Sequence, residues 1–206
     1  MAIPKRHSSA ENIVSGQRTF FVTTSTDKKR FLLQGERSAK LLIEVMFHYR
    51  DQGEYRLHDF VVMRNHFHAQ ITLSEDKTVE RAMQLIKGGF SHRARKELGF
   101  KRTFWQRGFS EDRVETREEF MAFRKYIYEN PVKAGLARTA EEYPYSSANP
   151  IFKSKGAAAE TASSRSQGST APLRSDPCRE ILQPTTGLRM TLLVRIRVRV
   201  RSRSVR

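Results

Sequence analysis

Two histidines separated by one residue, His66 and His68, have the spacing in this 206-residue chain that most directly suggests chemistry. Side chains two positions apart in a β-strand lie on the same face, and here Gln70 and Thr72 continue a polar face opposite an apolar one. Two imidazoles on an open polar face can share a divalent ion such as Mn²⁺, Co²⁺, Ni²⁺ or Zn²⁺, with Mg²⁺ a less natural match. The simpler alternative is a pair of surface histidines without a function.

A tyrosine and an asparagine, Tyr126 and Asn130, lie four residues apart and therefore on nearly the same side of a predicted helix. An apolar stripe at helical spacing runs beside them, made of Phe120, Phe123 and Ile127. If the stripe packs on a sheet, Tyr126 presents its phenol where the core meets the polar face. Two simpler interpretations stay open. Asn130 can cap a new turn that begins at Pro131 and ends near Gly135, and Tyr126 can pack with its hydroxyl in water.

The elements that must position these residues follow from hydrophobic periodicity. Strands are predicted over 18–24, 55–63, 66–73 and 104–114, and helices over 36–50, 78–97 and 117–129. Only two residues separate the second and third strands, a length typical of a hairpin. The order β-α-β-β-α-β-α predicts an α+β, ferredoxin-like antiparallel sheet with the helices packed on one face.

Positive charge is the clearest feature of the composition, because 38 Lys and Arg against 22 Asp and Glu give a formal net charge of +16. Residues 151–206 hold 12 of these basic residues and 3 of the acidic ones, a surplus of nine, in a segment rich in Ser, Ala, Thr, Pro and Gly. We therefore predict one compact domain over 1–150 and a disordered, low-complexity basic tail over 151–206. The surplus predicts a polyanionic partner, with nucleic acid favoured over an anionic membrane.

Several other classes of protein are excluded. No apolar run approaches the roughly 18 residues that a membrane-spanning helix needs, and the N-terminus has no apolar segment of a secretory signal. The single cysteine, Cys178, allows neither an intrachain disulfide framework nor a cysteine-rich zinc site. These features predict a soluble protein of a reducing, intracellular compartment, without a membrane partner.

Basic residues gather on and just after the second predicted helix, where they offer contacts to the phosphates of a nucleic acid. They are Lys87, Arg93, Arg95, Lys96, Lys101 and Arg102. For any one of them, the alternative is a solvated helix face. Trp105 and Phe109 can stack on unpaired bases, although packing in the core is the more common role of such residues.

Four segments together resemble the HUH single-tyrosine transposases, in particular their REP-associated branch. The segments read VVMRNHFHAQI at 61–71, TFWQRGFSEDRV at 103–114, YIYENPVKAGL at 126–136 and EEYPYSSA at 141–148. The resemblance covers about residues 18–149. Arg64 departs from the family pattern, which usually has proline before the Asn-His pair, and residues 151–206 match no part of it.

The resemblance implies a metal-dependent, single-strand DNA transposase of the bacterial cytoplasm and nucleoid. It implies that His66 and His68 bind Mg²⁺ or Mn²⁺, that Asn130 completes the metal site, and that Tyr126 is the nucleophile that nicks DNA near a hairpin and forms a 5′-phosphotyrosine. The implied partner is single-stranded or hairpin DNA. Some relatives assemble active sites between subunits, so both a monomer and a homodimer are open. The alternatives are a non-catalytic module that binds hairpin or single-stranded nucleic acid, and a degenerate product of a mobile element.

Overall fold

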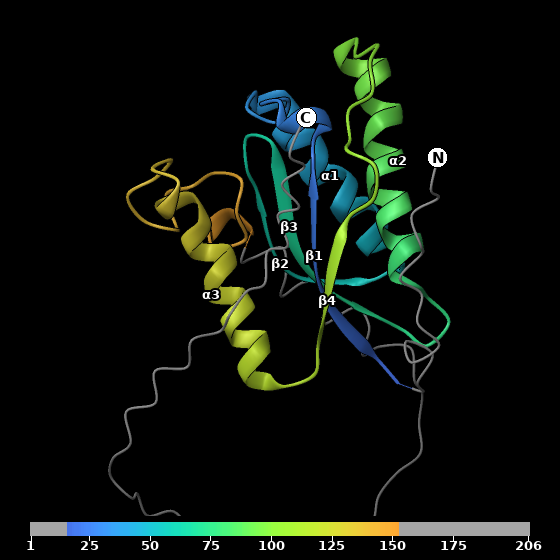
Figure 1. Cartoon of the computed structure of the whole chain (residues 1–206), viewed down its shortest axis with the longest axis vertical. Helices are drawn as coiled ribbons and strands as arrows, with labels where there is room; N and C mark the ends of the chain where they lie inside the picture. The colour runs from blue at the N-terminus through green and yellow to red at the C-terminus, as the bar shows by residue number, and fades with distance from the viewer. Residues whose placement is uncertain (1–15, 153–206) are drawn as a thin grey trace, which may run out of the picture. The chain divides into compact units, whose positions relative to one another are not determined.

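The computed structural model describes residues 16–152, which form a four-stranded antiparallel sheet with three α-helices (Figure 1). The strands are β1 (Arg18–Ser25), β2 (Arg56–Val62), β3 (His66–Leu73) and β4 (Ser110–Val114). The helices are α1 (Glu36–Asp51), α2 (Val79–Leu98) and α3 (Arg117–Lys133), and a short 3-10 turn, η2 (Asp27–Lys29), follows β1. The strand order is β2-β3-β1-β4. This arrangement confirms the predicted α+β class and the element order β-α-β-β-α-β-α.

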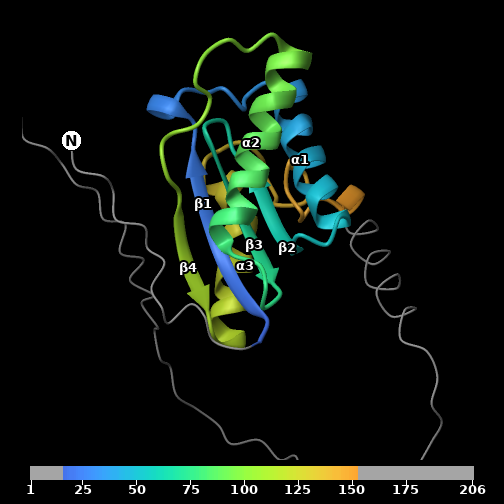
Figure 2. The same cartoon turned by 90° about the vertical axis from the view of Figure 1, so that its right-hand side faces the viewer.

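Helices α1 and α2 cover one face of the sheet and enclose the larger hydrophobic core (Figure 2). Alternate residues of β1 and β3 point into this core, as strand geometry requires. Its largest fully buried side chains include Phe60, Phe67, Phe90, Leu42 and Met46. The predicted last strand, 104–114, is shorter than expected. Phe104 and Trp105 pack against Phe90 in this core, with ring centroids 4.5 and 5.3 Å from it, and β4 begins only at Ser110.

Helix α3 packs on the opposite face, so the prediction that all helices share one face was wrong (Figure 1). The second face has its own small apolar cluster, in which Phe21 of β1 and Val61 of β2 lie under Phe123 and Ile127 of α3. Phe21 stacks on Phe123 with ring centroids 4.4 Å apart. Phe20 and Phe21 are consecutive and therefore point to opposite faces, which gives the sheet an apolar surface on both sides.

Helix α3 continues through Pro131 to Lys133, so the proposed new turn capped by Asn130 does not form. The carbonyl of Asn130 accepts a hydrogen bond from the Ala134 amide at 3.0 Å, as a helical residue does. Pro131 is buried within the last turn of the helix. Gly135 has φ +65°, which confirms the predicted glycine just beyond the helix end.

The outer edge of β2 is covered by the segment that follows α3. The Val62 amide donates to the Tyr145 carbonyl at 2.9 Å, and the Ser147 amide donates to the Phe60 carbonyl at 2.9 Å. Further on, the ring of Phe152 packs against Phe60 with centroids 5.4 Å apart. The predicted basic tail falls almost entirely on 153–206, outside the described residues. Within the described residues, no helix combines the length and apolar character needed to cross a bilayer.

Candidate active site

His66 and His68 lie side by side at the start of β3, on the face that α3 covers. Their ring centroids are 4.8 Å apart. His68 is only 4% exposed, with the ring of Phe21 stacked beside it at 5.4 Å. The prediction of an open polar face is therefore wrong for His68, because α3 closes over it, whereas His66 keeps partial access to solvent.

Each imidazole is oriented through its Nδ1 atom. Asn65 donates from Nδ2 to the Lys29 carbonyl at 3.2 Å, so its Oδ1 faces His66 and accepts from Nδ1 at 2.6 Å. Nδ1 of His68 lies 2.7 Å from the hydroxyl of Thr23 in the neighbouring strand β1. Both arrangements leave Nε2 available for another partner, and Nε2 of His68 is buried without one among the described residues.

The environment keeps both imidazoles in the neutral form that binds metals. Burial lowers the pKa of His68 to about 3, with a smaller contribution from the neighbouring His66. Burial likewise lowers the pKa of His66 to about 4, and the positive charge of Lys29 adds to the effect. A neutral imidazole has a lone pair on the nitrogen that carries no proton, which is the form that coordinates a cation.

Tyr126 of α3 lies directly over this pair within the same chain. Its ring meets that of His68 edge-on, with centroids 5.2 Å apart, and meets Phe21 in a similar way at 5.8 Å. Tyr126 is only partly buried, so its position lets solvent or a ligand approach the phenol. A tyrosine from helix α3 and two histidines from β3 therefore converge, as the sequence predicted.

Asn130 lies one helical turn beyond Tyr126 on the same flank of α3. Its side chain is half-buried and makes no hydrogen bond within residues 16–152. Its amide oxygen is therefore available to complete a site with the two imidazoles.

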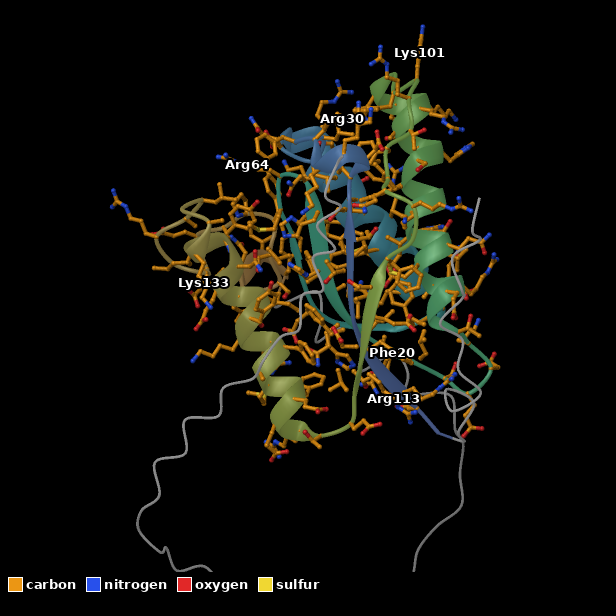
Figure 3. The ribbon with its side chains drawn as sticks, viewed as in Figure 1. Phe20, Arg30, Arg64, Lys101, Arg113 and Lys133 are labelled. Carbon is orange, nitrogen blue, oxygen red and sulfur yellow. The ribbon has the colours of Figure 1, made fainter. Side chains whose placement is uncertain are left out.

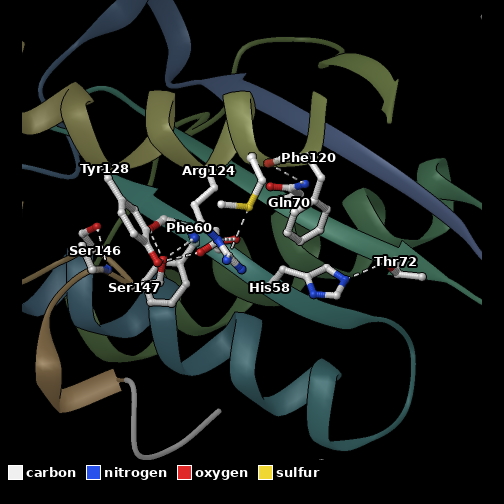
Figure 4. Close-up of polar contacts among 12 residues, drawn as sticks. His58, Phe60, Gln70, Thr72, Phe120, Arg124, Tyr128, Ser146 and Ser147 are labelled. Atoms are coloured by element: carbon white, nitrogen blue, oxygen red, sulfur yellow. Dashed lines mark hydrogen bonds and ion pairs between the residues drawn. The ribbon is translucent and has the colours of Figure 1, made fainter. Parts of the chain in front are cut away.

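A buried carboxylate on β2 fixes the other flank of α3 (Figure 4). Asp59 is 2% exposed and accepts hydrogen bonds from Nε of Arg124 at 3.0 Å and from the hydroxyl of Tyr128 at 2.8 Å. Burial and the charge of Asp59 raise the pKa of Tyr128 to about 12, so this phenol remains a donor. Arg124 and Tyr128 are offset by two residues from Tyr126 and Asn130, and about 200° around the helix separates the two flanks. We call these three residues the Asp59 clamp.

The residues fit a divalent cation bound mainly by neutral ligands. The unpartnered, buried Nε2 of His68 beside a second imidazole is what a ligand site requires, and hydrogen bonds at Nδ1 are the usual means of orienting such ligands. Among the described residues, no group of three or more His, Cys, Asp or Glu side chains could hold a metal ion. Among the described residues, a third ligand would therefore come from another kind of side chain, and the amide oxygen of Asn130, one helical turn beyond Tyr126, is the candidate.

The cations predicted to contact DNA fall into two groups. Lys87 is occupied within the protein, because its Nζ donates to the carbonyls of Gln106 at 3.0 Å and Gly108 at 2.6 Å. Burial lowers the pKa of Lys87. Arg93 is also engaged, since it donates to Glu97 at 2.6 Å and to Glu44 at 2.8 Å.

The other four predicted cations, Arg95, Lys96, Lys101 and Arg102, are exposed at the end of α2 and in the turn after it. Figure 3 shows Lys101 beyond the end of this helix. Trp105 is 7% exposed and donates from Nε1 to the Lys87 carbonyl at 3.1 Å. Phe109 packs partly against the same core. For these two aromatic residues, the structure supports the packing interpretation over base stacking.

Sequence reasoning missed the residues that support the site, namely Asn65, Thr23 and the Asp59 clamp. A signal existed for Asp59, which directly precedes the apolar run at 60–63 and must find partners if buried. No sequence signal indicated Thr23, because its contact with His68 depends on the register of β1 against β3.

Known proteins resemble this chain in sequence and in fold. The family model described as "Transposase IS200 like" matches residues 17–130. The REP-associated tyrosine transposase of Escherichia coli K12 is 28% identical over 134 residues, which cover 65% of this chain and 77% of that protein. A solved structure of a REP-associated tyrosine transposase bound to a REP hairpin has a similar fold, with a TM-score of 0.58, 21% identity, and coverage of 89% of this chain and 100% of that one. The matched region contains both histidines, the tyrosine and the asparagine, and the chain belongs to the IS200-like transposase family.

Proposed function

We propose that this protein is a metal-dependent DNA transposase that nicks and rejoins single-stranded DNA through Tyr126. The observation that carries the proposal is the edge-on contact of the Tyr126 ring with His68, whose buried Nε2 has no partner within residues 16–152. In this proposal, the contact joins the nucleophile to the pair of metal ligands inside one chain.

In this proposal His66 and His68 hold a divalent ion, Mg²⁺ or Mn²⁺, through Nε2, and Asn130 adds its amide oxygen. A bound ion would neutralise and polarise the scissile phosphate. The three ligands are uncharged, so they leave the positive charge of the site undiminished where the phosphate must lie. Asn65 and Thr23 hold the imidazoles in the orientation that this role requires.

The proposed reaction exchanges one phosphoester bond for another. The phenolic oxygen of Tyr126 attacks phosphorus and loses its proton to solvent, while the bond from phosphorus to the 3′ oxygen breaks and that oxygen takes up a proton. The products are a 5′-phosphotyrosine and a free 3′ hydroxyl. Attack by another 3′ hydroxyl reverses these steps and releases Tyr126, so strands can be rejoined without an external energy source.

The proposed substrate is single-stranded DNA next to a hairpin. The solved relative is bound to a REP hairpin, and this chain has the net charge of +16 expected of a protein that binds a polyanion. The exposed cations at the end of α2 are candidates for phosphate contacts.

The direct test is formation of a covalent adduct between the full chain and a labelled hairpin oligonucleotide with a single-stranded flank, in Mn²⁺ or Mg²⁺. We expect an adduct that survives denaturation, and its complete loss in Tyr126→Phe or after addition of EDTA. Tyr145→Phe, which removes a phenol outside the site, is the matched control and should retain the adduct. An adduct formed by Tyr126→Phe would disprove the assignment. Hairpin binding that is insensitive to EDTA and gives no adduct would indicate a non-catalytic binding protein.

A further inference from the structure

A basic turn between β1 and α1 presents the one exposed Phe, Tyr or Trp ring in the described part of the chain. Phe31 is 60% exposed, whereas every other Phe, Tyr and Trp of residues 16–152 is at least partly buried. Lys28 and Lys29 precede it and are exposed as well. A single exposed apolar residue needs no explanation by itself, so the argument depends on how this turn is built and on what lies beside it.

The backbone of the turn is held in an unusual conformation. Lys28 and Lys29 both have φ of 54°, in the left-handed region that costs a residue with a β-carbon about 1–2 kcal/mol. The conformation is fixed by hydrogen bonds from the Lys29 amide to the Thr26 carbonyl at 3.0 Å and from the Thr26 hydroxyl to the Arg30 carbonyl at 2.6 Å. Strained residues that are held in this way are common at sites that bind ligands.

Several hydrogen bonds join this turn to the hairpin that leads into His66. Asn65 donates to the Lys29 carbonyl at 3.2 Å and accepts from His66 at 2.6 Å, so a single side chain connects the turn to an imidazole. The Leu33 amide donates to the Arg64 carbonyl at 2.9 Å. Arg64 is exposed and lies at the same end of the molecule as Arg30 (Figure 3).

The cations of this region differ in what engages them. Arg30 is used inside the protein, where it pairs with Asp27 at 2.9 Å and donates to the Thr103 carbonyl at 3.0 Å. In contrast, no ion pair within residues 16–152 engages Lys28, Lys29 or Arg64. Three exposed cations and one exposed ring therefore lie in a turn and a hairpin that hydrogen bonds connect to His66, the outer imidazole of the pair. We call these four residues, Lys28, Lys29, Phe31 and Arg64, the basic ledge.

We propose that the basic ledge binds the single-stranded nucleotides next to the scissile phosphate, with an unpaired base stacked on Phe31 and the flanking phosphates at Lys28, Lys29 and Arg64. The proposal rests on the proposed function, because it concerns the path of DNA to the same site. An aromatic ring stacks on a base only where that base is unpaired, which favours single-stranded DNA over a duplex. The three positive charges suit its backbone.

The test is equilibrium binding of the full chain, in EDTA, to two fluorescent hairpin probes that differ only in a single-stranded thymidine flank. We expect the wild-type protein to bind the flanked probe more tightly than the blunt one. Phe31→Leu should weaken binding of the flanked probe about tenfold and leave the blunt probe unchanged. Phe31→Trp, which keeps a stacking surface, should retain the preference for the flanked probe. With abasic sites in the flank, the wild-type protein and Phe31→Leu should bind that probe with equal affinity.

The lysines are tested through the salt dependence of binding. Asparagine tolerates the left-handed backbone, so Lys28→Asn with Lys29→Asn removes two charges with little strain. This pair should lower the salt slope for the flanked probe by about one to two. Lys125→Gln with Lys133→Gln on α3 removes the same charge and should leave that slope unchanged.

Equal binding of the two probes by the wild-type protein, or an unchanged preference in Phe31→Leu, would overturn the proposal. Because these measurements need neither metal nor cleavage, they are independent of the adduct assay. A failure of Tyr126 as the nucleophile and a failure of the basic ledge would therefore be seen separately.

Discussion

The two faces of the sheet are built from the same strands but differ in what they bury. The face under α1 and α2 is lined by apolar side chains such as Phe67, Ala69 and Ile71 of β3, each completely buried. The face under α3 buries the alternate residues of the same strand, among them His68 and Gln70, beside a small apolar cluster. The first face supplies most of the hydrophobic stabilisation. The second face contributes less, because it buries polar side chains under a helix where apolar ones could lie.

The largest effect should come from the α1 and α2 face. Phe90→Ala removes a fully buried ring that contacts Phe104 and Trp105, so it should lower the free energy of unfolding by about 3–5 kcal/mol. We expect the folded fraction to form adduct at the wild-type rate, because the ring lies on the other side of the sheet from Tyr126. Denaturant unfolding and adduct kinetics measure the two quantities. A folded variant with a much slower adduct rate would show that the faces are not independent.

A change in the Asp59 clamp should have a smaller effect on stability than Phe90→Ala and a larger effect on the rate of adduct formation. Asp59→Asn weakens the hydrogen bonds to Arg124 and Tyr128 and should cost about 1–3 kcal/mol of stability. We expect adduct formation to slow about tenfold, because a rotated α3 moves Tyr126 away from His68 and small misplacements are costly. If the rate falls while the DNA affinity stays unchanged, the substitution affects the position of Tyr126 and not the binding of DNA.

The exposed ion pair of Glu44 with Arg93 on the other face provides a matched control for the clamp. Glu44→Gln should cost less than about 1 kcal/mol and leave the adduct rate unchanged. Tyr128→Phe removes only one hydroxyl from the clamp and should fall between the two variants. If Asp59→Asn and Tyr128→Phe both react at the wild-type rate, the clamp has no role in placing the nucleophile.

A substitution of Gln70 should change the stability in the opposite direction. Gln70 is fully buried under α3, its Oε1 has no hydrogen-bond partner within the described residues, and its Nε2 donates weakly to the Phe120 carbonyl at 3.5 Å. Gln70→Leu should therefore stabilise the protein by about 1 kcal/mol. The neighbouring Ile71→Val, which alters the apolar face, should destabilise it by a similar amount. Thermal unfolding of the two variants side by side tests the contrast, and a loss of stability in Gln70→Leu would contradict it.

The sequence predicted the fold class and the central strands well, because periodicity directly encodes which residues share a face. The range 66–73 coincides with β3, and the tyrosine and the histidine pair do converge. The face of the sheet on which α3 packs could not be predicted from β3 alone, because β3 has apolar side chains on one face only. The information lay in Phe21 on β1 and in Val61 on β2, whose apolar side chains provide a second surface.

The supporting contacts could not be predicted for a different reason. The bond between Thr23 and His68 joins residues 45 positions apart, and the bond between Asp59 and Tyr128 spans 69 positions. Both depend on strand register and helix rotation, which local propensity does not determine. Likewise, the engagement of Lys87 with the carbonyls of Gln106 and Gly108 needs a loop conformation that composition does not reveal.

The segment that runs along the edge of β2 has a consequence for where the folding unit ends. The family match stops at residue 130, yet the backbone groups of Phe60 and Val62 find their partners at Ser147 and Tyr145. A protein shortened to residue 130 would leave an apolar strand with unpaired amides and carbonyls, which is a template for self-association. Strand β4, at the other edge of the sheet, carries Glu111, Asp112 and Arg113, and such ionisable side chains disfavour pairing with another strand. The two edges of the sheet are therefore protected in different ways, by added backbone along β2 and by charged side chains on β4.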